Sequence, residues 1–164
     1  MKKYMDRALG FTLIELMMVI AILALLAMIA VPTGMRFLAK SKRAEAYVNL
    51  HSIYAAQKAY FAEHGKYSDV LNGSGGVGWQ PEGYAGGGAN EKFYYTYGIS
   101  SGHEGQNYFT GKLGAQATFL GQGFVSDKEF LILAAADIDG DGRLDILSVD
   151  HNNNIVVVQD DIEQ

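Results

Sequence analysis

The stretch Gly10–Leu16 reads Gly-Phe-Thr-Leu-Ile-Glu-Leu, and an apolar run, Met17–Val31, follows it directly. Between residues 11 and 31 the only polar side chains are those of Thr12 and Glu15. As one α-helix this stretch would be about 32 Å long, enough to cross the roughly 30 Å hydrocarbon core of a membrane. Lysine and arginine side chains in the short preceding segment favour a cytoplasmic position for that segment. The sequence therefore predicts a membrane-spanning N-terminal helix.

Glu15 is the unusual residue in this run, because a charge at membrane depth is costly and marks a functional hypothesis. A helix that begins near Phe11 would offset part of the cost through its positive N-terminal end. Three plainer interpretations compete: a cleaved secretory signal peptide, a signal anchor with an incidental Glu15, and the core helix of a soluble protein. Residues 28–30 read Met-Ile-Ala and Pro32 follows, which makes a poor signal-peptidase site. An uncharged run of this length is also unusual for a soluble core helix.

The basic leader, the Gly10-Phe11 junction, Glu15 and the continuous apolar run together resemble the class III leader junction of type IV pilins. The resemblance implies that a prepilin peptidase cuts between Gly10 and Phe11 and that the new N-terminal Phe11 is N-methylated. It also implies that the helix forms the core of a filament and that Glu15 is the assembly glutamate. The similarity extends over residues 1–68, where residues 40–68 look like type IVa major pilins, and it is weak beyond them.

An amine–carboxylate pair gives this assembly role a physical basis. Cleavage creates a positive amine on Phe11, which an incoming subunit can present to Glu15 of a neighbour, and a buried carboxylate needs such a partner. A head-to-tail contact of this kind extends a filament when it does not close into a ring. The expected partners are further copies of the chain in a helical homopolymer, a prepilin peptidase and N-methyltransferase, an assembly platform in the inner membrane, and the membrane itself before assembly.

The whole chain predicts an α+β fold, in which a long N-terminal helix packs against a C-terminal antiparallel sheet. We divide it into a leader (1–10), a transmembrane or filament-core helix (11–34), the amphipathic half of the same helix (35–66), and a globular domain (67–164). Pro32 removes a helical hydrogen bond, and Gly34 follows it, so we expect a kink or a loosened turn at this point. The helical pattern resumes at residue 35, and Gly65 suits a C-cap.

Two faces of the second helical half carry distinct side chains. Apolar and aromatic residues recur at three- and four-residue spacing and predict the face on which the globular domain packs: Tyr47, Leu50, Ile53, Tyr54, Tyr60 and Phe61. Basic residues cluster just after the apolar run: Arg36, Lys40, Lys42 and Arg43. They predict either a solvated flank or contacts with acidic surfaces of neighbouring subunits or with lipid head groups.

The rest of the chain predicts loops followed by a meander. Glycine-rich loops dominate the middle, and residues 79–84 predict a surface loop pinned by its aromatic side chains. Strands are predicted over 93–99, 129–136, 144–149 and 155–159, with a turn over 151–154. The acidic terminus, residues 160–164, is expected to be exposed. No glycine-rich loop ends in the Gly-Lys-Ser/Thr of a phosphate-binding loop, which argues against nucleotide binding.

The segment Asp137–Asp145 matches the first nine positions of an EF-hand calcium loop, with Gly142 at the sharp turn of position 6. The candidate ligands are the carboxylates of Asp137, Asp139, Asp141 and Asp145 and the backbone carbonyl of Arg143. Position 12 is Ser148, which offers no bidentate carboxylate, and the flanks predict strands rather than helices. Two interpretations stay open: a strand–loop–strand site for one Ca²⁺, with Asp150 as an additional ligand, and a plain acidic hairpin. Mutual repulsion of the carboxylates favours the first.

Composition narrows the function classes. The net charge is −5, which argues against nonspecific nucleic-acid binding, and no specific nucleic-acid site is identified. There is no cysteine, so the C-terminal region needs a restraint other than a disulfide. The four histidines lie far apart without zinc-ligand spacing, and no nucleophile elbow occurs. We therefore expect a protein that is not an enzyme.

Three functions are consistent with the sequence. The first is a structural subunit of a type IV pilus, which is held in the inner membrane by one span and then polymerised outside the cell. By the resemblance, such filaments serve adhesion, twitching motility or DNA uptake. The second is the major pseudopilin of a type II secretion system. The third is a membrane-anchored calcium-binding module that does not polymerise.

Overall fold

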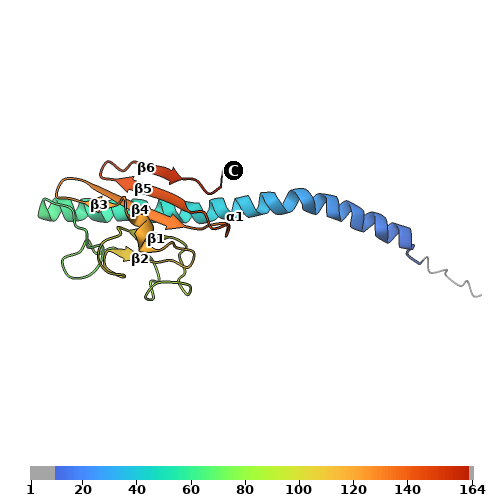
Figure 1. Cartoon of the computed structure of the whole chain (residues 1–164), viewed down its shortest axis with the longest axis horizontal. Helices are drawn as coiled ribbons and strands as arrows, with labels where there is room; N and C mark the ends of the chain where they lie inside the picture. Colours follow the sequence, from blue (N-terminus) through green and yellow to red (C-terminus); the bar gives the residue numbers. More distant parts are fainter. Residues whose placement is uncertain (1–9, 163–164) are drawn as a thin grey trace, which may run out of the picture. The chain divides into compact units, whose positions relative to one another are not determined.

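A computed structural model of the chain describes residues 10–162 (Figure 1). The contacts divide the chain into two compact units, the residues up to Arg36 and those from Phe37 onward. One helix, α1 (Leu13–His64), contributes to both units, and all strands belong to the second. Of the predicted leader, only Gly10 lies within the described residues.

The ends of α1 follow from its terminal residues. The helix begins at Leu13, two residues after the predicted start, because Thr12 caps it. It ends at His64, and Gly65 adopts the left-handed conformation with φ 72°, which a residue without a Cβ tolerates. The Gly65 N–H donates to the carbonyl oxygen of Phe61 at 2.8 Å. Gly65 thus occupies the position expected of a C-cap.

Proline does not interrupt the helix. Pro32 lies inside α1, and the helix continues through Gly34. The proline ring leaves the carbonyl of Met28 without its usual helical donor. One residue later the Thr33 hydroxyl donates to the carbonyl oxygen of Ile29 at 2.9 Å. The kink at Pro32 and Gly34 stays a prediction.

The second unit is an antiparallel sheet along the second half of α1 (Figure 1). Its strands are β1 (Thr96–Gly98), β2 (Tyr108–Phe109), β3 (Phe124–Val125), β4 (Phe130–Ala136), β5 (Asp145–Asp150) and β6 (Ile155–Gln159), with a short 3₁₀ helix, η1 (Ala117–Leu120). The order is β2-β1-β4-β5-β6, and β3 pairs with β4. The predicted α+β fold, a long helix against a C-terminal antiparallel sheet, is confirmed.

Strand β4 separates two cores because its side chains alternate between the two faces of the sheet. Phe130, Ile132, Ala134 and Ala136 share the main core with Leu50 and Ile53 of α1. Leu133 and Ala135 point to the other face and pack with Ala115 and Leu120 around η1. The predicted packing face of α1 is therefore correct, and Tyr60 is the one predicted member outside this core cluster.

The aromatic residues of the glycine-rich region form part of the main core. Trp79 is only 7% exposed, and its ring meets those of Tyr97 and Phe109 edge-on at centroid distances of 5.9 and 5.5 Å. Its indole N–H donates to the Ser52 hydroxyl of α1 at 2.7 Å. The prediction that residues 79–84 form a surface loop pinned by its aromatic side chains is confirmed, since Gln80, Glu82 and Gly83 are exposed while Trp79 is buried with a polar partner.

Two predictions need correction. The strand predicted over 93–99 shrinks to β1, because the N–H of Tyr94 donates to the Glu45 carboxylate at 2.8 Å instead of to a strand. The prediction that residues 160–164 are exposed is wrong at Asp161 and Ile162, which are buried, and residues 163 and 164 lie outside the described part of the chain. The C-terminal strand predictions match β4, β5 and β6 to within one residue at each end.

Candidate functional site

The Gly10-Phe11 junction precedes a helix start in which Thr12 and Glu15 cap each other. Glu15 Oε2 accepts hydrogen bonds from the Thr12 backbone N–H at 2.9 Å and from the Thr12 hydroxyl at 2.7 Å. The Thr12 hydroxyl oxygen in turn accepts from the Glu15 N–H at 3.3 Å. This is a capping box, which satisfies two N–H groups that a helix start leaves unpaired. The Thr-x-x-Glu spacing could have revealed it in the sequence.

The apolar side chains on either side of this cap are exposed. Phe11, Leu13 and Ile29 are 77%, 76% and 73% exposed, and the most apolar window of α1 has no buried residue. The helix is long and apolar enough to cross a membrane. A surface of this size and composition requires a covering by lipid or by other protein.

The loop between β4 and β5, residues 137–144, is called the aspartate loop here. Each of its three carboxylates accepts at least one backbone N–H: Asp137 from Gly140 and Gly142 at 2.7 and 3.0 Å, Asp139 from Asp141 at 3.1 Å, and Asp141 from Arg143 at 2.8 Å. Gly142 makes its turn with φ 92°. The structure brings Asp137, Asp139 and Asp141 together as predicted, but their fourth carboxylate is Asp161, not Asp145.

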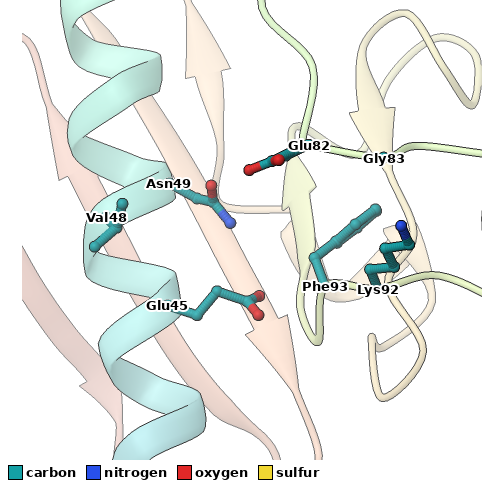
Figure 2. Close-up of a pocket in the computed structure, with 7 residues that line it drawn as sticks. All are labelled: Glu45, Val48, Asn49, Glu82, Gly83, Lys92 and Phe93. Carbon is teal, nitrogen blue, oxygen red and sulfur yellow. The ribbon is translucent and has the colours of Figure 1, made fainter.

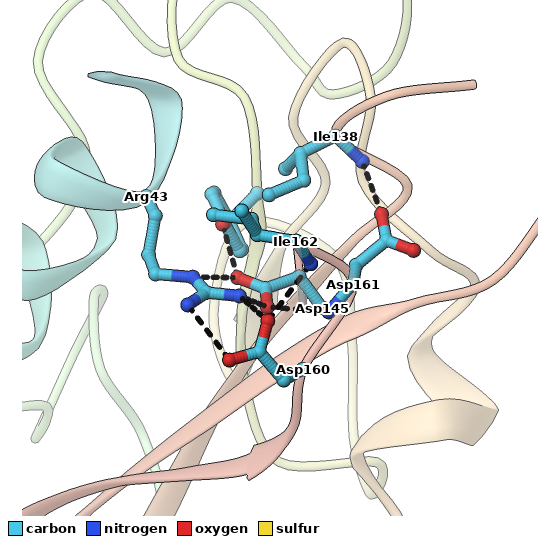
Figure 3. A network of polar contacts seen from close by, with 7 residues as sticks. Arg43, Ile138, Asp145, Asp160, Asp161 and Ile162 are labelled. Carbon is cyan, nitrogen blue, oxygen red and sulfur yellow. Dashed lines mark hydrogen bonds and ion pairs between the residues drawn. The ribbon is translucent and has the colours of Figure 1, made fainter. Parts of the chain in front are cut away.

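Asp145, a predicted calcium ligand, instead lies in a buried ion-pair cluster (Figure 3). Its side chain is fully buried and accepts from the Arg43 Nε–H at 3.0 Å, from Arg43 Nη2 and from the Tyr95 hydroxyl at 2.6 Å. Arg43 also donates to Asp160, through Nη2 at 2.5 Å and Nη1 at 3.2 Å. The expectation that Asp145 binds calcium is therefore wrong, because four donors already saturate its two oxygens.

The pKa shifts of Arg43 and Tyr95 agree with this hydrogen bonding. Burial lowers the pKa of Arg43, but its hydrogen bonds to Asp160 and Asp145 outweigh burial and raise the pKa overall. Burial, together with the bond to Asp145, raises the pKa of the Tyr95 hydroxyl, which stays a donor. Arg43 therefore links α1 to the start of β5 and to the segment after β6, rather than forming part of a solvated basic flank.

Two further predicted residues have structural partners. Lys42 Nζ donates to the carbonyl oxygen of Ile138 in the aspartate loop at 2.5 Å. Asp150 Oδ1 accepts from the N–H groups of Asn152 and Asn154, each at 2.9 Å, and so caps the turn between β5 and β6. Asp150 is absent from the carboxylate group of the aspartate loop.

A surface hollow of about 600 Å³ lies between α1 and the loops before β1 (Figure 2). Its α1 side presents Glu45 and Asn49, and Figure 2 shows both side chains directed toward the segment that carries Phe93. Glu45 Oε1 accepts from the Tyr97 hydroxyl at 3.2 Å, and Asn49 Nδ2 donates to the same hydroxyl at 2.9 Å. Burial raises the pKa of Glu45. These polar groups hold β1 against the helix.

Comparison with known proteins relates the chain to type IV pilins. The family model described as the prokaryotic N-terminal methylation motif matches residues 5–31. The type IV major pilin protein PilA of Myxococcus xanthus is 48% identical over 80 residues, and a type IV major pilin protein PilE1 of Neisseria gonorrhoeae is 40% identical over 72. The resemblance to type IV pilins is confirmed.

The similarity to these pilins covers less than half of this chain and of each relative. The match to PilA covers 49% of this chain and 35% of PilA, and the match to PilE1 covers 44% of this chain and 43% of PilE1. The family model, which matches residues 5–31 of this chain, includes the junction at Gly10, Glu15 and the start of α1. The sheet and the aspartate loop of this pilin-like chain are understood from its own structure.

Proposed function

We propose that the chain is a structural subunit of a type IV pilus. Its N-terminal helix inserts in the inner membrane, a prepilin peptidase cleaves after Gly10 and methylates Phe11, and the subunit then polymerises into an extracellular filament. One observation carries the proposal: the apolar half of α1 buries none of its side chains within the chain and holds a single carboxylate at its start. Lipid covers this surface before assembly, and neighbouring helices replace the lipid afterwards.

The capping box is compatible with an assembly role for Glu15. Both bonds from Thr12 end on Oε2, so the amine of Phe11 from a second copy can approach Oε1. The carboxylate can thus stabilise its own helix start and still neutralise a neighbour. Such a pair inside a bundle of apolar helices gains more from the attraction than it would in water.

A pilus is favoured over the two alternatives. The relatives carry the name of type IV major pilins, which supports a pilus rather than the pseudopilus of a type II secretion system. A calcium-binding module that never polymerises leaves the Gly10-Phe11 junction without a purpose. We expect the filament to act in adhesion, twitching motility or DNA uptake, and the subunit itself to perform no catalysis.

Gly10→Val is expected to leave the precursor uncleaved, because a branched side chain crowds the peptidase site at the scissile bond. The measurement is mass spectrometry of the N-terminus, on membranes and on filaments sheared from the cell surface and imaged by electron microscopy. Wild-type filaments should contain a chain that begins with N-methylated Phe11.

Gly34→Val provides the matched control, since it makes the same change at a glycine inside α1, where an added Cβ also meets open space. This variant should be processed like the wild type. Filament-derived wild-type protein that still begins at Met1 would contradict the proposed processing.

A further inference from the structure

The segment after β6 brings a fourth carboxylate to the aspartate loop. One ligand oxygen from each of Asp137, Asp139, Asp141 and Asp161 lies within 4.8 Å of the other three. Asp161 is only 1% exposed, and the loop aspartates Asp139 and Asp141 are exposed. The group therefore has a buried wall and an open side.

One carboxylate oxygen of the buried Asp161 accepts no hydrogen bond from the described residues. Asp161 Oδ2 accepts from the N–H of Ile138 at 3.4 Å, as Figure 3 shows. The other oxygen, Oδ1, is buried and has no hydrogen-bond partner among residues 10–162. A buried carboxylate oxygen without a partner is costly and calls for an explanation. A cation bound between Asp161 and the aspartate loop supplies one.

Two basic side chains of α1 near this group have partners outside it. Lys42 gives a hydrogen bond to the backbone carbonyl of Ile138, and Arg43 pairs with Asp145 and Asp160. The negative charge that these carboxylates share is the condition under which a divalent cation binds.

We propose that Asp137, Asp139, Asp141 and Asp161 form a binding site for one Ca²⁺ ion. Carboxylate oxygens suit a hard cation, and nothing in the set is a nitrogen or sulfur ligand of the kind zinc prefers. Two oxygens that each lie about 2.4 Å from a Ca²⁺ ion are at most about 4.8 Å apart, and the corresponding limit for Mg²⁺ is about 4.2 Å. The four ligand oxygens, which all lie within 4.8 Å of one another, meet this condition for Ca²⁺. The backbone carbonyl of Arg143 and water complete the usual six to eight oxygens.

The site differs from an EF-hand in the source of its last carboxylate. An EF-hand takes it from position 12 of the same loop, which here is the buried Ser148 of β5. Asp161 enters instead from beyond β6. Calcium would therefore connect the β4–β5 turn to the C-terminal segment and restrain an end of the fold that no disulfide restrains.

The test is calcium binding by the full-length chain in detergent micelles, measured by titration calorimetry and by thermal unfolding with and without chelator. Wild type should bind one Ca²⁺ with a Kd of about 10⁻⁴–10⁻³ M, as extracellular modules do, and its Tm should rise with calcium. Asp161→Asn, which keeps the shape and removes the charge, should weaken binding at least about tenfold, because ligand charge sets the affinity. Asp139→Asn at an exposed position should do the same without a risk to folding.

Asp127→Asn is the matched control, because it removes the same charge from an exposed aspartate of another turn; its calcium binding should equal that of the wild type. An unchanged wild-type Tm across millimolar calcium and chelator would overturn the proposal, and so would wild-type affinity in Asp161→Asn and Asp139→Asn. An equal response to Mg²⁺ would overturn the assignment to calcium.

Discussion

Filaments are expected to disappear when Glu15→Gln is the only copy of the chain, while cleavage and membrane insertion continue. Glutamine at the third helical position still completes a capping box with Thr12, so the helix start is retained and only the charge is lost. The amine of a neighbouring Phe11 would then enter an apolar surrounding without a counter-charge. Removing one member of a buried charge pair costs about 2–5 kcal/mol, so filament yield should fall at least about tenfold.

The measurement is the yield of sheared filaments relative to processed subunit in the membrane. Thr12→Val is the complementary control, because it removes the hydroxyl bonds of the cap and keeps the carboxylate. It should assemble better than Glu15→Gln. A Glu15→Gln strain with wild-type filament yield would refute the pairing of Glu15 with the amine.

Arg43→Ala is expected to lower the free energy of unfolding of the second unit by about 3–5 kcal/mol, because it leaves the fully buried Asp145 without its counter-charge. Trp79, the sole tryptophan and a buried one, provides the signal, so denaturant unfolding of the full-length chain in detergent can be followed by its fluorescence. The loss should persist at high salt, since a buried pair is screened less than a surface pair.

Arg36→Ala makes the same change at an exposed position of the same helix and should alter stability by less than about 0.5 kcal/mol. Asp160→Asn should cost less than Arg43→Ala, because Asp160 is one-third exposed and Asp145 would keep its partner. An Arg43→Ala chain as stable as Arg36→Ala would show that the buried cluster contributes nothing net to the fold.

Local patterns explain which parts of the structure the sequence predicts. The apolar run that contains Glu15 predicts α1, and short apolar runs bounded by turn residues predict β4, β5 and β6. The middle of the chain has no such pattern, because strands of two or three residues are held by side chains from elsewhere. For example, the Glu45 carboxylate of α1 accepts a hydrogen bond from the N–H of Tyr94, which lies 49 residues later in the sequence.

The two acidic sites illustrate the same limit. Asp137, Asp139 and Asp141 are recognisable as a group because their spacing is local. The bonds from Arg43 to Asp145 and Asp160 span 102 and 117 residues, and no spacing rule connects such distant positions. For that reason the sequence grouped Asp145 with the aspartate loop and gave no sign that Asp161 lies beside it.

The long-range bonds of Arg43 also have a consequence for the order of folding. The second unit is synthesised from α1 toward β6, so Arg43 emerges more than a hundred residues before Asp160 completes its surroundings. Until then the growing chain has a cationic helix face and an unfilled aromatic core, and contacts of such high sequence separation form late. A nascent chain that stops after β6 would lack both Asp160 and Asp161, so Arg43 would have Asp145 but not yet Asp160. The last few residues of the chain therefore complete a contact that begins on its first helix.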